Sequence, residues 1–159
     1  MRNNLYVGLV HFPVYNKFNE VVTTSITNLD IHDISRSCRT FGVRRFFVIN
    51  PLETQKKLLE RILEFWDSKI AKLYNPYRAD ALSLIEYTDT IESAVESIKK
   101  QEEDSPIIIT TTAAKLKTQI SYKECYKIYN PILLLFGTGN GLTSRVHKLA
   151  NYILKPIKG

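Results

Sequence analysis

Three glycines separated by single residues are the first group with a possible chemical role, in the stretch LLLFGTGNGLTS at residues 133–144. Four apolar residues lead into this turn, and an apolar, helix-like stretch follows it. A strand that ends in a glycine-rich turn and opens a helix commonly holds a ligand through main-chain groups, because glycine adopts positive φ and lets the backbone come close. From the residues alone, a tight turn that binds nothing is the alternative.

The two familiar glycine-rich phosphate sites do not fit this turn. A dinucleotide-binding turn follows the first strand and needs an acidic residue about 20 positions later, but only 18 residues follow Gly141. A P-loop needs Lys and then Ser or Thr directly after its last glycine, where this chain has Leu142 and Thr143. A second small, polar strand end is TTTAA at 110–114. Two such loops at the carboxyl edge of a parallel sheet would suit a flat heteroaromatic ligand.

A second group combines acids, a base and cations in the helix-like stretch DIHDISRSCRTF at residues 30–41. The Arg36 guanidinium could grip a phosphate or stabilise a developing negative charge, and Arg39 could join it. Asp30 and His32 could accept a proton from a base or a ribose hydroxyl. The alternative for Arg36 is a surface ion pair with Asp33, three positions earlier. The alternative for Asp30 and His32 is a polar role at the start of a helix.

Charge and composition narrow the function classes. The formal charge of +6 and the pI near 9.3 are compatible with a polyanionic partner without requiring one. The segment YNPYRADA at 74–81 mixes aromatic and basic residues, Arg78 among them, as contacts to single-stranded RNA do; a packed loop with a proline turn is the alternative.

The histidines have no zinc-ligand spacing, so we expect no metal site. Cys38 and Cys125 lie outside any CxxC motif, which favours free thiols in a cytoplasmic protein.

The elements that must position these groups alternate along the chain. Apolar runs of strand length predict strands, and apolar residues spaced by three or four predict helices. The alternation predicts one α/β domain with a mainly parallel sheet, and we expect no membrane span and no signal peptide. The predicted strands are 5–12, 44–50, 82–87, 106–112 and 131–137, and the predicted helices are 30–41, 53–73, 91–98 (capped by Thr90) and 142–153.

Two stretches resemble motifs of the SPOUT RNA methyltransferases, the trefoil-knotted class. Residues 131–159, PILLLFGTGNGLTSRVHKLANYILKPIKG, are similar to a motif of its SpoU-like branch, in which a strand enters a G-x-G-L-S turn. Residues 30–49 are similar to the first motif of that branch, with Arg36 on the motif's arginine and Phe41-Gly42-Val43 on its F-G-V. The resemblance covers about residues 5–159 and looks closest to a small bacterial branch related to the C-terminal domain of tRNA (guanine-N1)-methyltransferase.

The resemblance implies methyl transfer from S-adenosylmethionine to RNA (tRNA or rRNA), by a SPOUT-like α/β knot that pairs as a homodimer. It implies catalytic roles for Arg36, Asp30 and His32, and RNA contacts by Arg36, Arg39 and Arg78. The cofactor contacts that it implies fall on the loops after three strands, at Thr111, Thr112, Phe136, Gly137, Thr138, Gly139, Asn140, Gly141, Leu142 and Ile157.

The chain departs from the family pattern in three places. Asp30 stands where the first motif has asparagine, and GTGNGL is one residue shorter than the usual G-N-E-G-x-G-L and has no glutamate. The family continues with a knot helix beyond the position of Gly159, so the domain 1–159 is expected to lack that helix and to dimerise weakly. Two other interpretations stay open: a non-catalytic RNA-binding module of the same fold, and a nucleotide-binding α/β protein unrelated to RNA.

Overall fold

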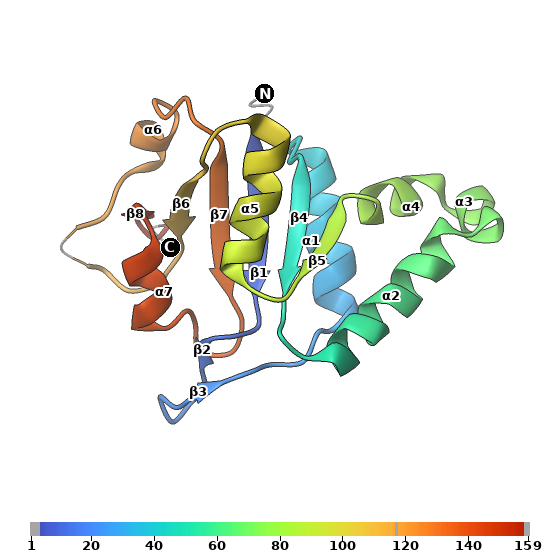
Figure 1. Ribbon diagram of the computed structural model, residues 1–159, viewed down its shortest axis with the longest axis horizontal. Helices are drawn as coiled ribbons and strands as arrows, with labels where there is room; N and C mark the ends of the chain where they lie inside the picture. Colours follow the sequence, from blue (N-terminus) through green and yellow to red (C-terminus); the bar gives the residue numbers. More distant parts are fainter. Residues whose placement is uncertain (1–3, 117, 158–159) are drawn as a thin grey trace.

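A six-stranded parallel sheet forms the centre of the computed structural model, which describes residues 4–116 and 118–157. The strand order is β5-β4-β1-β7-β6-β8, and every neighbouring pair is parallel. This confirms the predicted α/β class and mainly parallel sheet. A short antiparallel hairpin, β2 (Val14–Tyr15) with β3 (Val21–Val22), lies beyond the end of β1 (Figure 1). The sheet strands are β1 (Leu5–Val10), β4 (Arg45–Ile49), β5 (Ile85–Thr88), β6 (Ile107–Thr110), β7 (Ile132–Gly137) and β8 (Tyr152–Ile153).

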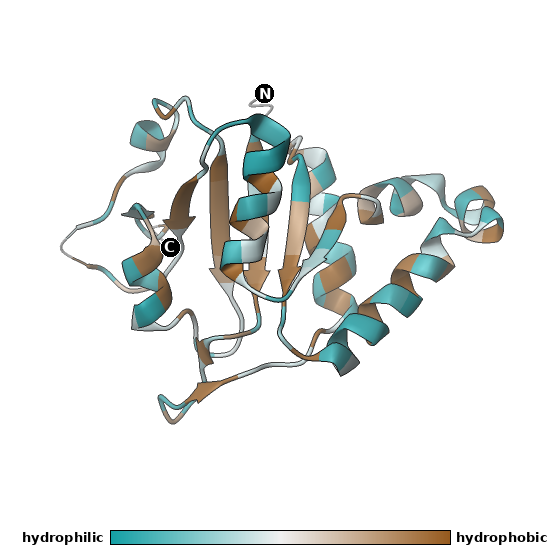
Figure 2. Ribbon diagram, in the orientation of Figure 1, coloured by the Kyte–Doolittle hydropathy of each residue, from teal (hydrophilic) through white to brown (hydrophobic). Residues whose placement is uncertain are grey.

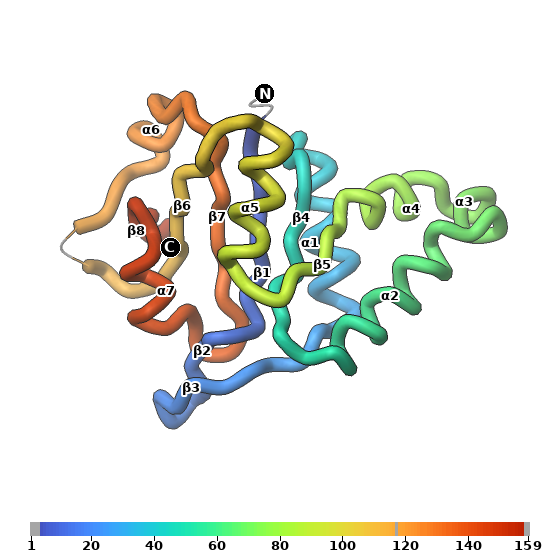
Figure 3. The backbone as a smooth tube through the Cα atoms, viewed as in Figure 1, coloured from blue at the N-terminus to red at the C-terminus, as the bar shows by residue number. Residues whose placement is uncertain are grey.

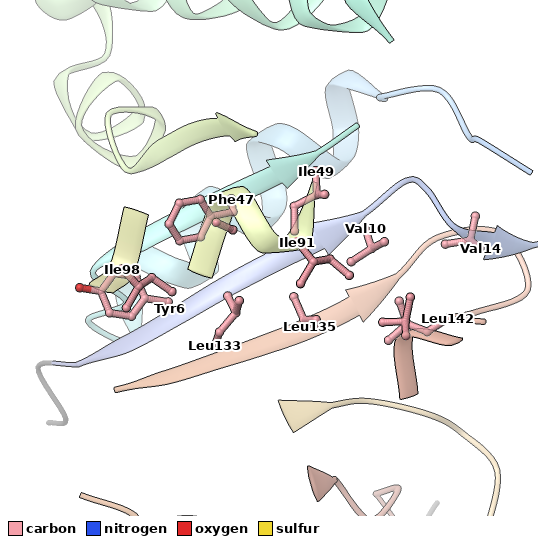
Figure 4. Packing of buried hydrophobic residues seen from close by; sticks show 12 residues of the cluster. Tyr6, Val10, Val14, Phe47, Ile49, Ile91, Ile98, Leu133, Leu135 and Leu142 are labelled. Atoms are coloured by element: carbon pink, nitrogen blue, oxygen red, sulfur yellow. The ribbon is translucent and has the colours of Figure 1, made fainter. Parts of the chain in front are cut away.

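Helices α5 (Ile91–Glu102) and α7 (Ser144–Leu149) cover one face of the sheet, and helix α1 (Asn28–Thr40) covers the other. In Figure 1, α5 and α7 lie in front of the sheet, and α1 lies behind it. Successive strand residues point to opposite faces, so Tyr6 and Val10 of β1 join the cluster under α5, whereas Val7 and Leu9 join the cluster under α1. Figure 4 shows the first cluster around Tyr6, Phe47 and Ile98. Strands β6 and β7 are brown over nearly their whole length in Figure 2, as expected when both faces of a strand are covered, whereas β5 at the edge of the sheet is more polar.

An arm of three helices extends from the β5 edge of the sheet (Figure 1). It consists of α2 (Glu53–Asp67), α3 (Lys69–Tyr74) and α4 (Pro76–Leu82). The predicted single helix 53–73 is therefore wrong at Ser68, whose side chain accepts a hydrogen bond from the Ala71 amide and starts a new helix. Such a cap contributes about 1 kcal/mol. Thr90 caps α5 as predicted, through its side chain and the Ser93 amide.

The last predicted helix, 142–153, is also wrong at its end. Helix α7 stops at Leu149, and the chain then forms the short strand β8. Asn151 explains the change, because its amide donates to the Ile108 carbonyl at 2.9 Å and its side-chain oxygen accepts from the Ile108 amide at 2.8 Å. These bonds bring the chain alongside β6. The predicted strand 82–87 begins later than expected, because Leu82 ends α4.

The remaining segments complete the sheet edge at β6 and β8. The chain between β6 and β7, which contains α6 (Tyr122–Cys125), forms a wide excursion at this edge that can be followed in Figure 3. The Ile120 amide donates to the Ile153 carbonyl, and the Lys155 amide donates to the Ile120 carbonyl. Cys38 and Cys125 are thiols rather than a disulfide, as predicted. Within the described residues, no helix is long and apolar enough to cross a membrane, and no group of His, Cys, Asp and Glu could hold a metal ion.

Candidate active site

The carboxyl ends of β6, β7 and β8 meet at one edge of the sheet. The Thr111 amide donates to the Leu135 carbonyl of β7 at 3.1 Å, and the Leu154 amide donates to the Thr110 carbonyl of β6 at 2.9 Å. The loops that follow these three strands therefore start side by side. The predicted juxtaposition of TTTAA and GTGNG at one sheet edge is confirmed.

The glycine turn after β7 is held from outside by the β2 strand. Gly139 has φ +57° and Gly141 has φ +104°, both left-handed values that favour glycine. The Asn140 amide donates to the Tyr15 carbonyl at 2.7 Å, and the Tyr15 amide donates to the Gly141 carbonyl at 2.9 Å. A Cβ on Gly139 would lie 2.7 Å from the Tyr15 carbonyl oxygen, whereas a Cβ on Gly141 would meet nothing within 4 Å. Gly139 is thus required by packing, and Gly141 borders open space.

A chain of hydrogen-bonded polar side chains supports the base of the turn. The Thr138 amide donates to the Val10 carbonyl at 3.2 Å, and the Thr138 and Thr24 hydroxyls are hydrogen-bonded. Thr24 in turn contacts Nδ1 of His11 at 3.0 Å, and the His11 side chain is fully buried. Burial lowers the pKa of His11 below its ordinary value of 6.5. Tyr15, Thr24 and His11 fix the turn, and no sequence pattern connects them with a glycine motif so far along the chain.

A groove separates helix α1 from strand β7, and we call it the α1–β7 groove. Its volume is about 790 Å³, and its walls include Asp30 of α1, Phe41 directly after α1, and residues 136–139 at the end of β7 and the start of the turn. Phe136 is 39% exposed and Phe41 is 70% exposed. An exposed apolar side chain on a central strand is unusual, because parallel sheets are normally covered on both faces.

A second groove lies on the other side of α1, between this helix and the arm. His32 and Arg36 line it together with Trp66 of α2 and Arg78 of α4. A helix turns by about 100° per residue, so His32 and Arg36, four positions apart, share one face of α1. Asp30 lies on a different face and lines the α1–β7 groove instead. The three predicted catalytic residues are therefore divided between two grooves within one copy of the chain.

The polar partners of these residues match the structural alternatives weighed from the sequence. Arg36 lies 3.8 Å from Asp33 in an exposed ion pair, and Nε of Arg39 lies 2.6 Å from Oδ2 of Asp80. The Asp30 carboxylate accepts from the Thr27 hydroxyl at 2.6 Å, and the Asp30 amide donates back to that hydroxyl at 3.1 Å. These contacts leave the Arg36 guanidinium available, because an exposed pair at this distance is worth well under 1 kcal/mol.

The predicted cofactor residues outside the turn are also at the carboxyl edge. The Thr111 hydroxyl donates to the Leu135 carbonyl at 3.0 Å, and the Thr112 hydroxyl accepts from the Ala114 amide at 3.1 Å. Leu142 is buried and packs in the core beneath α5 and α7, so it supports the turn from below. Ile157 follows β8 and is 82% exposed.

Comparison with known proteins identifies the family of the chain. The sequence profile of a family described as SAM-dependent RNA methyltransferase matches residues 4–159. The chain belongs to this family. The predicted reaction class and cofactor, RNA methylation with S-adenosylmethionine, are confirmed at the level of the family.

The relatives of this methyltransferase family member include longer proteins. Two tRNA (guanine-N(1)-)-methyltransferases, from Nitratidesulfovibrio vulgaris and Oleidesulfovibrio alaskensis, are 40% and 38% identical over 157 residues. These matches cover 98% of this chain and 37% of each relative. An uncharacterized protein from Aquifex aeolicus is 28% identical over 163 residues, which cover all of this chain and 80% of that protein. The chain thus spans little more than a third of the length of the two named relatives.

Solved structures share the fold at low sequence identity. A probable methylase family protein from Haemophilus influenzae superposes with a TM-score of 0.63 at 17% identity, over 100% of this chain and 57% of that one. The SpoU methyltransferase AviRb from Streptomyces viridochromogenes, in complex with AdoMet, gives a TM-score of 0.56 at 16% identity, over 100% and 51%. These likenesses confirm the SpoU-type fold.

The residues at the sheet edge fit an S-adenosylmethionine molecule. A Cβ on Gly141 would meet no atom within 4 Å, so the backbone of the turn is accessible at this residue. The loops after β6 and β7 offer small residues and main-chain groups, which can recognise an adenine edge without a charged side chain. When bound, S-adenosylmethionine supplies an electrophilic methyl group on its sulfonium. The chain's own residues would enclose the cofactor and orient it.

Proposed function

We propose that this protein methylates tRNA, with S-adenosylmethionine held at the carboxyl edge of β6, β7 and β8. The observation that carries the proposal is the open glycine turn at that edge, in a chain that matches the family over residues 4–159. The two relatives named as tRNA (guanine-N(1)-)-methyltransferases favour tRNA over rRNA and guanine as the methylated base. We propose that residues 1–159 act as one methyltransferase domain in the cytoplasm.

The proposed roles follow the position of each residue. Main-chain groups of Gly137 to Gly141 and the loop residues Thr111 and Thr112 hold the cofactor, with Ile157 closing over it. Arg36 stabilises the negative charge that develops on the RNA, with Arg39 beside it on α1. Asp30 lies in the same groove as the glycine turn, so it is the proposed proton acceptor. His32 faces the other groove, where it contacts RNA and takes no proton.

The proposed assembly is a homodimer that buries the α1–β7 groove. Within one copy, α1 separates Arg36 from the glycine turn, so Arg36 can reach a cofactor only in a second copy. The apolar walls of the groove, with Phe41 and Phe136 exposed, fit a self-complementary contact. We expect weak, concentration-dependent pairing in light scattering. Phe41→Ser should weaken it, whereas Ile70→Ser on α3, which removes an equally exposed apolar side chain, should leave it unchanged.

Methyl transfer tests the function directly. Purified protein, unmodified tRNA transcripts and radiolabelled S-adenosylmethionine should give label in RNA, and calorimetry should give cofactor binding with or without RNA. If the radiolabelled methyl group appears only in an rRNA transcript, the substrate is rRNA and not tRNA. Cofactor binding without any labelled RNA would point to a missing partner domain. A chain that binds tRNA but no cofactor would instead be a non-catalytic RNA-binding module, and the proposed function would be wrong.

A further inference from the structure

The groove between α1 and the arm is a site of its own, remote from the cofactor turn. Its volume is about 600 Å³. We call it the arginine–tryptophan groove, after the lining residues that distinguish it: His32, Arg36, Arg61, Phe65, Trp66 and Arg78. Its two walls are α1 and the arm formed by α2 to α4, which projects from the sheet in Figure 1.

Aromatic rings and a guanidinium pack against one another in this groove. The Arg78 guanidinium carbon lies 5.2 Å from the Trp66 ring centroid. The His32 ring meets Trp66 edge-on with a centroid distance of 5.5 Å, and Phe65 does so at 5.3 Å. Trp66 therefore lies at the centre of an aromatic and cationic surface. Phe65 is 59% exposed, so part of this surface faces solvent.

Two polar atoms in the groove lack the partners that burial normally demands. Nε of Arg78 and Nδ1 of His32 are buried, and neither has a hydrogen-bond partner among the described residues. Buried polar atoms in folded proteins are nearly always paired, and one left unpaired costs about 1–3 kcal/mol.

The charge of the groove is positive and largely uncompensated. Arg61 and Arg78 form no ion pair among the described residues, and the contact of Arg36 with Asp33, at 3.8 Å, is loose and exposed. Asp33 is the one carboxylate among the lining residues. If the only role of these guanidinium groups were to hold the arm against α1 by salt bridges, each of them would have a carboxylate partner in the groove. An excess of guanidinium groups instead complements phosphate, which guanidinium binds with two hydrogen bonds.

We propose that the arginine–tryptophan groove binds an unpaired nucleotide of the substrate RNA. The base packs against Trp66 and Phe65, and a neighbouring phosphate contacts Arg61. This inference rests on the proposed function in one respect, that the substrate is RNA. Stacking of unpaired bases on aromatic side chains combined with arginine contacts is a common mode of single-stranded RNA recognition.

Trp66 makes the test direct, because it is the one tryptophan of the 159-residue sequence and its emission reports on this groove alone. Titration with a short unstructured oligoribonucleotide should quench that emission in a saturable way. The same oligonucleotide with abasic residues, inorganic polyphosphate and a perfect RNA duplex should quench little.

Two substitutions test the base stacking and the phosphate contact of the proposed RNA site separately. Phe65→Leu keeps the reporter and alters an exposed side chain, and we expect about tenfold weaker RNA binding because stacking is worth about 1–3 kcal/mol per base. Arg61→Gln should reduce the slope of log affinity against log salt by about 0.7, the loss of one phosphate contact on a single strand. Lys100→Gln on α5 is the matched control, since it removes an equal charge on the opposite side of the sheet, and it should change neither value.

Each outcome separates this proposal from the proposed function. If RNA leaves the Trp66 emission unchanged while methyl transfer proceeds, the groove is not an RNA site, and a docking face for a protein is the better interpretation. Equal quenching by RNA and by polyphosphate would also overturn base recognition. If single-stranded RNA quenches the emission while the chain neither binds S-adenosylmethionine nor methylates any RNA, the groove proposal stands and the proposed function is wrong.

Discussion

Substitution of Gly139 tests why the glycine turn is built as it is. A Cβ at this position would lie 2.7 Å from the Tyr15 carbonyl oxygen, a main-chain atom that also accepts the Asn140 amide at 2.7 Å. Overpacking of this kind costs about 1–3 kcal/mol. Gly139 also has φ +57°, which costs most L-residues about 1–2 kcal/mol but costs asparagine less. Gly139→Asn therefore isolates the steric contact, and Gly139→Ala adds the cost of the backbone conformation.

We expect Gly139→Asn to lower the free energy of unfolding by about 1–3 kcal/mol and Gly139→Ala by about 2–5 kcal/mol. Urea unfolding followed by circular dichroism measures both values, provided that the slope against urea is unchanged. Calorimetry under native conditions should show weaker S-adenosylmethionine binding for each folded variant, because the turn must move away from Tyr15. The control is Tyr15→Phe, which keeps the carbonyl and removes only the hydroxyl that contacts Ser144.

The reasoning is refuted if Gly139→Asn is as stable as the unsubstituted chain, since the space behind Gly139 would then not be closed by Tyr15. The reasoning is also refuted if Gly139→Asn and Gly139→Ala lower the free energy of unfolding by the same amount as Tyr15→Phe. Full stability with abolished cofactor binding would show that a Cβ at Gly139 enters the ligand's space, and Gly139 would then contact the cofactor directly.

The other predictions concern charge, pH and thiol reactivity. Arg36→Ala should slow methyl transfer by about a hundredfold, or about 3 kcal/mol, with S-adenosylmethionine affinity in calorimetry nearly unchanged; equal loss of both would mean a structural role. Burial lowers the pKa of His11 below 6.5 in the folded state, so the unfolded state binds more protons below that pH. Stability should therefore fall as the pH drops from about 6.5 through the folded pKa, and urea unfolding at pH 5.5 and 7.5 should show a smaller difference for His11→Asn. Burial raises the pKa of the Cys38 thiol to about 12, so a thiol reagent at pH 8 should label Cys125 first and reach Cys38 only on unfolding; rapid labelling of two thiols in the native chain would contradict this.

Much of the fold follows from local patterns. Five apolar runs predicted five of the six sheet strands, because a strand buried on both faces reads as an uninterrupted apolar segment. The sequence missed β8, since Tyr152 and Ile153 continue the apolar spacing of α7 and only the contact of Asn151 with Ile108 turns them into a strand. The break at Ser68 was missed for a similar reason. A capping serine inside a regular apolar stripe gives a weak local signal.

The candidate site likewise has features that the sequence predicted and features that only tertiary packing decides. The glycine turn and the TTTAA loop were recognisable in the sequence because their position after apolar strands and their small residues are local properties, and the parallel sheet then brings them together. The sequence could not show that Asp30 and Arg36 face different grooves, which depends on how α1 is rotated against the sheet. It also gave no sign of Tyr15 behind the turn or of Trp66 beneath Arg78. Contacts between residues far apart in the chain are decided by tertiary packing alone, since no local periodicity records which distant surface a side chain will meet.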